Sequence, residues 1–348
     1  MSATPQASIS ELLLEWYDGH ARKLPWRVAP GSGERPDPYR VWLSEVMLQQ
    51  TTTAAVAPYF AAFTERWPDV ESLAAASEDE VMAAWAGLGY YSRARNLVKC
   101  AREVSAMGGF PDSEAELRKL PGIGDYTAAA IAAIAFGRRA VVVDANAERV
   151  VARLFGIEKP LPGARKAIRA EADAITPDER AGDFAQAMMD LGATICTARD
   201  ARCLLCPLSG HCEARATGDP VRLPVKAAKK TKPQRTGTAF WIERDGAVWL
   251  VKRPVKGMLG GMRALPDDGW TARRDGDGEA PLAGAWKAAG VLRHGFTHAD
   301  LELGVAVYAG EASQPEGEGE WWPLDRLDDA GLPTLFAKAA RLVLASRG

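Results

Sequence analysis

Two carboxylic acids lie in segments that otherwise offer little charge. Glu45 falls in VWLSEVML (41–48), and Asp144 follows the apolar run AVVV (140–143). Burial in apolar surroundings favours a protonated acid, whereas hydrogen bonds to a carboxylate favour its ionised form. A protonated acid and a carboxylate are the residue types that general acid and electrostatic catalysis need. The plainer interpretations are an exposed or ion-paired Glu on a helix and an Asp that caps a helix.

Four of the five cysteines are close together in CTARDARCLLCPLSGHC, residues 196 to 212. Cys196, Cys203, Cys206 and Cys212 are six, two and five residues apart, so their thiolates can converge on one metal centre. Zinc ribbons usually pair two C-x2-C knuckles and this stretch has one, whereas an iron–sulfur cluster is also held by four Cys. The spacing alone leaves zinc and iron–sulfur open. A disulfide is not expected in a reducing cytosol, and Cys100 is expected to be a buried core thiol.

A glycine-rich turn, LPGIG (120–124), precedes a segment rich in Ala and Ile. Gly122 and Gly124 permit a tight turn with exposed amides, and a helix that begins there adds its positive end. This geometry suits one phosphate. An ordinary tight turn between two helices is the plainer interpretation.

The elements that must position these residues change in character along the chain. Apolar positions recur at helical spacing from residue 8 to about 215, and short apolar runs separated by Gly-rich turns follow, with a final helix at 333–346. The sequence therefore predicts a multidomain protein with an all-α core and a smaller α+β domain. The predicted domains are residues 1–225 and 238–348, joined by a basic linker at 226–237.

The amino-acid composition says less about the function than the motifs do. The 348 residues are 47% apolar with a net charge of −2, and the linker carries five cations and no acid. Those cations suit a phosphate backbone, although a flexible solvated linker is the plainer interpretation. The apolar runs are too short to cross a membrane, and the N-terminus lacks a signal-peptide pattern, so a globular cytosolic protein is expected.

Taken together, the motifs resemble a known family. The cysteine spacing and LPGIG resemble the endonuclease III superfamily of helix-hairpin-helix DNA glycosylases. Within it, four further segments resemble MutY-type adenine DNA glycosylases: SEVMLQQT (44–51), GLGYYSRARNL (87–97), VVVDANAERV (141–150) and FAQAMMDLGATICT (184–197). The resemblance implies a 4Fe-4S cluster at the four cysteines, where it braces a basic loop that contains Arg199 and Arg202.

The resemblance also assigns chemical roles. Glu45 would protonate N7 of adenine, Asp144 would stabilise the oxocarbenium ion, and Tyr126 and Asn146 would organise them. Tyr126 stands where bifunctional relatives carry the lysine that forms a Schiff base, so strand cleavage should be slow or absent. The family usually has Gly and Val at positions 145 and 147, where this chain has Ala, and we expect Ala145 to begin a helix.

Contacts with DNA follow from the same resemblance, because adenine must leave the duplex stack to be reached. Gln50 and Tyr90 are candidates to wedge into the gap, and Leu88 offers backbone contacts to the opposite base. Arg27 and Gln186 are expected to line the adenine pocket. Packing within helices and turns is the plainer interpretation, and the insertion APGSGERPD (29–37) leaves the path of its loop open.

The second domain resembles a Nudix-like domain from RPVKGMLGGMRALP (253–266) onward. VLRHGFTHADLEL (291–303) resembles the loop by which MutY-type enzymes detect 8-oxoguanine. Phe296, Thr297 and His298 fill the usual Phe-Ser-His positions, and Arg263 replaces a common Trp. The acid-rich Nudix box is missing from the sequence, so this domain is expected to read damage and hydrolyse nothing. A strand-edge histidine is the plainer interpretation of His298.

The sequence thus predicts a monomeric, prokaryotic, monofunctional glycosylase that removes adenine opposite 8-oxoguanine or guanine in duplex DNA. Two alternatives remain. One is a bifunctional glycosylase of damaged pyrimidines, which the missing lysine disfavours. The other is a non-enzymatic DNA-binding iron–sulfur protein, which the pairing of Glu45 with Asp144 disfavours.

Overall fold

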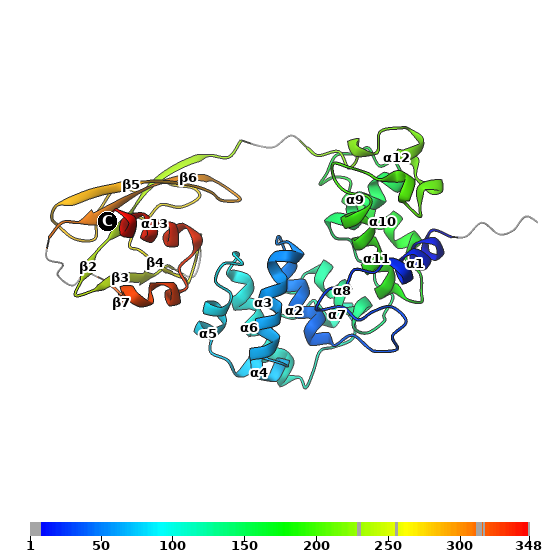
Figure 1. The fold of residues 1–348 in the computed structure, drawn as a ribbon, viewed down its shortest axis with the longest axis horizontal. Helices are drawn as coiled ribbons and strands as arrows, with labels where there is room; N and C mark the ends of the chain where they lie inside the picture. Colours follow the sequence, from blue (N-terminus) through cyan, green and yellow to red (C-terminus); the bar gives the residue numbers. More distant parts are fainter. Residues whose placement is uncertain (1–7, 228–230, 255–256, 311–314, 316, 347–348) are drawn as a thin grey trace, which may run out of the picture. The chain divides into compact units, whose positions relative to one another are not determined.

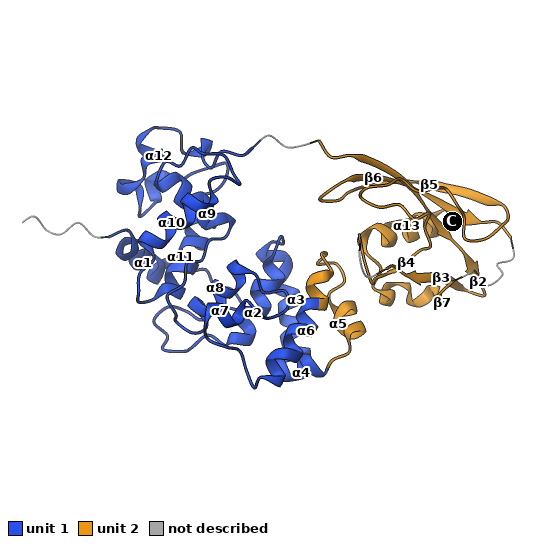
Figure 2. Cartoon of the chain, turned by 180° about the vertical axis from the view of Figure 1, so that it is seen from behind, with its two compact units in different colours: residues 1–75, 96–228 blue, residues 76–95, 229–348 orange. Residues whose placement is uncertain are grey.

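The computed structural model describes residues 8–227, 231–254, 257–310, 315 and 317–346 (Figure 1). Two compact units divide the chain: residues 1–75 with 96–228 form unit 1, and residues 76–95 with 229–348 form unit 2 (Figure 2). Residues 228–230 of the predicted linker and residues 255–256 of the predicted Nudix-like start lie outside the described residues. None of the described helices is long and apolar enough to cross a membrane.

Unit 1 is helical, which confirms the periodicity expected over residues 8 to 215. Its helices are α1 (Ile9–His20), α2 (Pro38–Leu48), α3 (Thr53–Arg66), α4 (Val70–Ala75), α7 (Glu114–Leu117), α8 (Asp125–Ile134), α9 (Ala145–Leu154), α10 (Arg165–Ile175), α11 (Ala181–Thr194) and α12 (Glu213–Ala216). Helix α5 (Glu78–Ala84) belongs to unit 2, and α6 (Ser92–Ala106) begins in unit 2 and continues in unit 1. Three short 3-10 turns, η1 (Cys203–Leu205), η2 (Ser209–His211) and η3 (Pro220–Arg222), belong to the cysteine segment and the residues after it.

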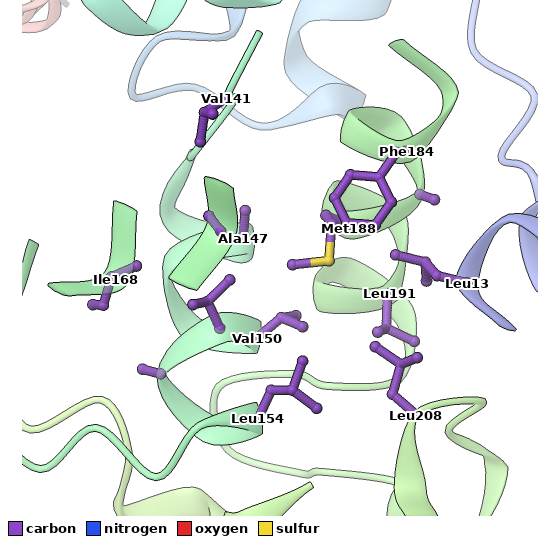
Figure 3. Close-up of a cluster of buried hydrophobic side chains, with 14 of the residues drawn as sticks. Leu13, Val141, Ala147, Val150, Leu154, Ile168, Phe184, Met188, Leu191 and Leu208 are labelled. Atoms are coloured by element: carbon purple, nitrogen blue, oxygen red, sulfur yellow. The ribbon is translucent and has the colours of Figure 1, made fainter. Parts of the chain in front are cut away.

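One hydrophobic cluster fixes α9 against α11 and α1 (Figure 3). Val150 and Leu154 of α9 face Met188 and Leu191 of α11, and Leu13 of α1 closes the cluster. Apolar residues at intervals of three and four produce this buried stripe. Because Asp144 directly precedes α9 and Cys196 lies two residues after the end of α11, the same packing fixes both the acid and the first cysteine.

Local signals in the sequence explain where the helices that bear the site begin. Asp37 caps α2 by accepting a hydrogen bond from the Tyr39 N–H, with Pro38 at the first helical position. Asp144 caps α9 in the same way, and Ala145 begins that helix as expected. Gly122 has a left-handed φ of 77°, whereas Gly124 caps α8 at a φ of −92° that other residues also adopt. Of the two glycines, the turn therefore requires a left-handed conformation only at Gly122.

Unit 2 contains two small sheets. In the first, β6 (Asp300–Tyr308) lies between β1 (Gln234–Trp241), which runs parallel to it, and β5 (Trp286–Gly295), which runs antiparallel. In the second, β3 (Ala247–Lys252) pairs antiparallel with β2 (Glu243–Arg244), β4 (Arg263–Ala264) and β7 (Gly319–Pro323). The short apolar runs of the sequence are thus strands, as expected.

A C-terminal helix completes unit 2. Helix α13 (Thr334–Ala345) follows the 3-10 segment η4 (Leu324–Ala330) and contacts β1, β5 and β6 (Figure 1). Leu335, Phe336 and Val343 pack with Leu301 and Leu303 in one buried cluster. The two-residue period of the strands and the helical period of α13 place these apolar side chains on facing surfaces. The expected final helix at 333–346 is confirmed within one residue at each end.

Candidate active site

A cavity of about 840 Å³ in unit 1 brings half of the predicted site residues together, including all four predicted catalytic residues. It opens between the end of α2, the turn before α8, the start of α9 and α11. Nine of the residues predicted to be functional line it: Arg27, Glu45, Gln50, Gly122, Gly124, Tyr126, Asp144, Asn146 and Gln186. Its volume falls in the range of pockets that hold small ligands. Leu88, Tyr90 and Phe296–His298 belong to unit 2.

Glu45 is buried on α2, with 6% of its surface exposed. Burial raises its pKa to about 7, and the charge of Asp144 adds to that rise, while the Tyr126 hydroxyl and Arg27 oppose it. The hydroxyl of Tyr126 donates a hydrogen bond to Oε2 of Glu45 over 2.7 Å. Burial also raises the pKa of Tyr126 well above its usual value, so the phenol stays a donor. Glu45 can therefore hold a proton near neutral pH.

Asp144 has more hydrogen-bond donors around it than Glu45. Its Oδ1 accepts from the Ala147 N–H over 2.6 Å, and its Oδ2 accepts from Nδ2 of Asn146 over 3.0 Å. Burial raises the pKa of Asp144, but these donors favour the carboxylate. The two acids of this cavity therefore differ in their surroundings. Such a difference allows one acid to stay protonated while the other is ionised.

Arg149, on the same helix as Asn146, holds the Asn146 side chain in place. Nη2 of Arg149 donates to Oδ1 of Asn146 over 2.8 Å and to the Gly192 carbonyl over 2.6 Å, and Nε donates to the Cys196 carbonyl over 2.7 Å. A Cβ atom at Gly192 would lie 2.6 Å from Cβ of Asn146, so only glycine permits this approach of α11 to α9. The position of Asn146, and with it Asp144, is fixed by both helices.

Arg27 is held at the cavity by a buried acid. Nη1 of Arg27 lies 2.8 and 2.7 Å from the two carboxylate oxygens of Asp190. The backbone N–H and Nε of Arg22 donate to the same carboxylate over 2.9 and 2.6 Å, and Asp190 is fully buried. Gln186, one turn earlier on α11, is 5% exposed. A buried charge is tolerated when it is paired and hydrogen-bonded in this way.

The inserted loop after Arg27 lies beside this cavity. Residues of the loop line a smaller pocket together with Ile134, Arg180 and Gln186. Ile134 and Gln186 also line the main cavity. The path that the sequence left open therefore runs near the end of α8 and the start of α11.

The two wedge candidates share an uncommon backbone conformation. Gln50 has a φ of 61° and Tyr90 a φ of 49°, in the left-handed region that few non-glycine residues adopt. Gln50 is exposed at the end of α2, and Tyr90 is 49% exposed. Such backbone conformations cost free energy and concentrate at functional sites. Leu88 differs, because its N–H already bonds the Trp85 carbonyl and its carbonyl accepts from Arg93.

The four clustered cysteines line one small cavity in unit 1. Burial raises the pKa of the Cys206 thiol to about 11, with a contribution from negative charge at the other three cysteines and against a backbone hydrogen bond from Leu208. Nη1 of the buried Arg153 lies 3.2 Å from Sγ of Cys196. Among the described residues, no three His, Cys, Asp or Glu side chains meet closely enough to hold a single metal ion. Four thiols around one cavity fit a group whose ligands bind different metal atoms, as in a four-cysteine iron–sulfur cluster.

The predicted reading turn of unit 2 is the tip between β5 and β6. The Phe296 N–H donates to the Ala299 carbonyl over 2.8 Å, which leaves Thr297 and His298 exposed at the tip. The ring of Phe296 lies against His294, with centroids 4.5 Å apart, and against Trp270 at 5.8 Å.

Arg263, which stands where the resembled family commonly has a Trp, contacts two side chains of the second domain. Its Nε lies 2.7 Å from Oε1 of Glu320, and its guanidinium stacks on the ring of Trp322 at 4.6 Å. An arginine is therefore accommodated at this position by a carboxylate and an aromatic face.

Known proteins match both units. The family of HhH-GPD superfamily base excision DNA repair proteins matches residues 43–174, and the NUDIX domain matches residues 238–342. The adenine DNA glycosylase of Mycolicibacterium smegmatis is 42% identical over 238 residues, which cover 67% of this chain and 79% of that protein. The human adenine DNA glycosylase is 33% identical over 397 residues, which cover 95% of this chain and 73% of that protein. The chain belongs to the adenine DNA glycosylase family.

Solved structures agree with the fold of this adenine DNA glycosylase family member. A thermostable thymine-DNA glycosylase has a TM-score of 0.53 and 30% identity, and the match covers 60% of this chain and 95% of that one. A non-covalent endonuclease III–DNA complex has a TM-score of 0.50 and 24% identity over 60% and 94% of the two chains. Together with the two family matches, these structures confirm the predicted helical glycosylase core and Nudix-like second domain.

Sequence reasoning did not single out several residues that hold the site of this adenine DNA glycosylase family member. Asp190 and Arg22 fix Arg27, and Arg149 and Arg153 connect the site to the cysteine segment. A usable signal existed for Asp190, because it is a single acid within the apolar stretch AMMDLGA, just as Glu45 is within VWLSEVML. No comparable signal marked Arg149, whose partners are backbone carbonyls and one amide.

Proposed function

We propose that this protein is a monofunctional glycosylase that hydrolyses the N-glycosidic bond of adenine opposite 8-oxoguanine or guanine in duplex DNA. The observation that carries the proposal is the placement of Glu45 and Asp144 in one cavity. There the Tyr126 hydroxyl donates a hydrogen bond to Glu45, and burial raises the pKa of Glu45 to about 7. The match to adenine DNA glycosylases over most of the chain supports adenine as the base.

The two acids divide the reaction between them. Glu45 gives its proton to N7 of adenine, and the bond from C1′ to N9 breaks with its electron pair passing to the purine. The deoxyribose then carries positive charge, which the Asp144 carboxylate stabilises. Water adds its oxygen to C1′ and releases a proton, which leaves an abasic sugar. Tyr126 orients Glu45, and Asn146 orients Asp144.

The absence of a nearby amine supports a monofunctional reaction. A Schiff base requires a lysine within reach of C1′. Tyr126 takes the expected lysine position, and the described residues that line the cavity include no lysine. We therefore assign base release, and not strand cleavage, to this site.

DNA binding would use residues of the unit 1 cavity and, from unit 2, Tyr90. The turn at Gly122 and Gly124 and the N-terminus of α8 offer backbone N–H groups to one phosphate. Gln50 and Tyr90 would occupy the space left by the flipped adenine, for which their exposure and left-handed backbone suit them. Arg27 and Gln186 would contact the adenine inside the cavity.

Two further assignments complete the proposal. The tip of Phe296, Thr297 and His298, of which the last two are exposed, would read 8-oxoguanine opposite the adenine. Cys196, Cys203, Cys206 and Cys212 would hold a 4Fe-4S cluster, which when bound would brace the loop that carries Arg199 and Arg202. Arg153, with its guanidinium on Cys196 and on the Thr197 carbonyl, would hold that loop against α9.

A single-turnover assay on three duplexes tests the function. We expect base release from A·8-oxoguanine and A·G duplexes and none from a thymine-glycol duplex, with no enzyme–DNA adduct after borohydride treatment. A trapped adduct with release of thymine glycol would instead establish the bifunctional alternative. Duplex binding without any base release would establish the non-enzymatic alternative.

A further inference from the structure

A lysine of the basic linker, Lys232, reaches the tip between β5 and β6. Nζ of Lys232 donates a hydrogen bond to the Phe296 carbonyl over 2.7 Å and lies 3.9 Å from Oδ1 of Asp300. The lysine thus contacts both sides of the tip, although 64 residues separate it from Phe296. Its side chain is 44% exposed, so this contact lies at the surface, where the tip residues are also exposed.

The sheet register brings Lys232 to this place. β1 runs parallel to β6 with Gln234 opposite Asp300, and the Asp300 N–H donates to the Pro233 carbonyl over 3.1 Å. Pro233 fixes its own φ and disfavours a helical conformation at Lys232. The backbone that bears the lysine is therefore positioned by strand pairing and not by the side chain alone.

The contact determines the orientation of one peptide group. A peptide unit is planar and trans, so its carbonyl and its N–H point in opposite directions. The carbonyl of Phe296 and the N–H of Thr297 belong to the same unit. When Lys232 holds the carbonyl, the Thr297 N–H is directed to the other side, and the ammonium polarises the unit so that this N–H is a stronger donor.

We propose that Lys232 is a positioning residue for damage reading, because its bond to the Phe296 carbonyl aims the Thr297 N–H at the C8 oxygen of 8-oxoguanine. Guanine carries a C–H at that place, so only the oxidised base can accept this hydrogen bond. The inference rests on the proposed reading role of the tip. A lysine that merely attracted phosphate would strengthen binding to every duplex alike.

Four forms of the full-length protein test this assignment: wild type, Lys232→Met, Lys232→Arg and Lys226→Met. The quantity measured is the ratio of base-release rates from A·8-oxoguanine and A·G duplexes, with enzyme in excess of DNA but below saturation. We expect Lys232→Met to lower the ratio about five- to tenfold, the effect of losing one hydrogen bond between two neutral groups, the Thr297 N–H and the C8 oxygen. Lys232→Arg keeps a cationic donor and should stay within about twofold of wild type. Lys226→Met removes a cation from the same linker and should leave the ratio unchanged.

The outcomes separate this inference from the function on which it rests. An unchanged ratio in Lys232→Met, or the same fall in Lys226→Met, overturns the positioning role. A wild type that releases adenine equally from both duplexes overturns the reading role of the tip, and a wild type that releases none overturns the proposed function. If Lys232→Met lowers the melting temperature, Lys232→Gln provides a neutral donor of similar length. That variant should give a ratio between those of Lys232→Met and wild type, and a ratio equal to wild type contradicts the inference.

Discussion

The cavity of unit 1 and the tip of unit 2 hold their functional groups in opposite ways. In and behind the cavity wall, Glu45 and Asp190 are buried side chains from two helices, each fixed by a partner distant in sequence. At the tip, Thr297 and His298 are exposed, and the group we assign to reading is a backbone N–H. The first region depends on side-chain burial, and the second depends on backbone direction.

This difference fits the roles that we propose for the two regions. A general acid needs a pKa near the working pH, and desolvation of a carboxyl group provides that shift. A reader of an intact base needs donors that meet the base edge from outside, and a backbone amide does so whatever side chain it carries. Substitutions in the cavity should therefore change rate and stability strongly, whereas substitutions at the tip should change only the preference between duplexes.

The largest effect is expected at Glu45. Glu45→Gln keeps the shape and the contact with Tyr126 but has no acidic proton, so the single-turnover rate on A·8-oxoguanine should fall about 10³-fold. Binding of the same duplex, measured by fluorescence anisotropy, should change less than about threefold. Retained turnover in Glu45→Gln would remove Glu45 from the mechanism and with it the contrast between the two regions.

The next largest effect is on stability, at Asp190. Asp190→Asn leaves the guanidiniums of Arg27 and Arg22 without their carboxylate, and breaking a buried ion pair costs about 3 kcal/mol. The free energy of unfolding, from urea titration, should fall by that amount. Asp183→Asn is the matched control, because it lies on the same helix but pairs with Arg180 at the surface, where a pair contributes less than about 1 kcal/mol. Equal losses in both variants would contradict a special role for burial at Asp190.

The sequence predicted the fold well because the fold depends on periodic signals. Helical spacing over α9 and α11 and the short apolar runs of β1, β3 and β6 each correspond to an observed element. For Asp144, the interpretation as a helix cap and the interpretation as a catalytic carboxylate are compatible. It caps α9, as an Asp after a β-branched run often does, and the same cap places its carboxylate in the cavity.

The parts that sequence could not predict depend on contacts between distant residues. Arg27 and Asp190 are 163 residues apart, and Lys232 and Phe296 are 64 apart. No local pattern encodes such pairs, because they exist only once helices or strands have packed. The left-handed backbone at Gln50 and Tyr90 was equally hidden, since neither residue type signals it as glycine does.

The pH dependence of base release should locate the acid within the cavity. With a pKa of about 7 for Glu45, the protonated fraction falls tenfold per pH unit above that value, and the single-turnover rate should fall with it.

The free energy of unfolding should also fall as the pH rises. The folded state holds this proton more tightly than the unfolded state, so the stability it contributes is present at low pH and lost as pH rises through about 7. Urea titrations at pH 5 to 9 should show this loss in wild type and not in Glu45→Gln. A flat rate profile between pH 7 and 9 would show that Glu45 does not donate its proton in the rate-determining step.

The smallest effect is expected at the tip. Thr297→Ser removes one methyl group and keeps both the hydroxyl and the backbone N–H, so the rate ratio between A·8-oxoguanine and A·G should change less than about threefold, a difference of under 1 kcal/mol. Thr297→Ala also keeps the N–H, and the ratio it gives shows what the hydroxyl adds. Both variants should unfold at the same urea concentration as wild type, because Thr297 is exposed. If Thr297→Ala abolishes the preference, the hydroxyl is the reader, and the tip then depends on a side chain just as the cavity does.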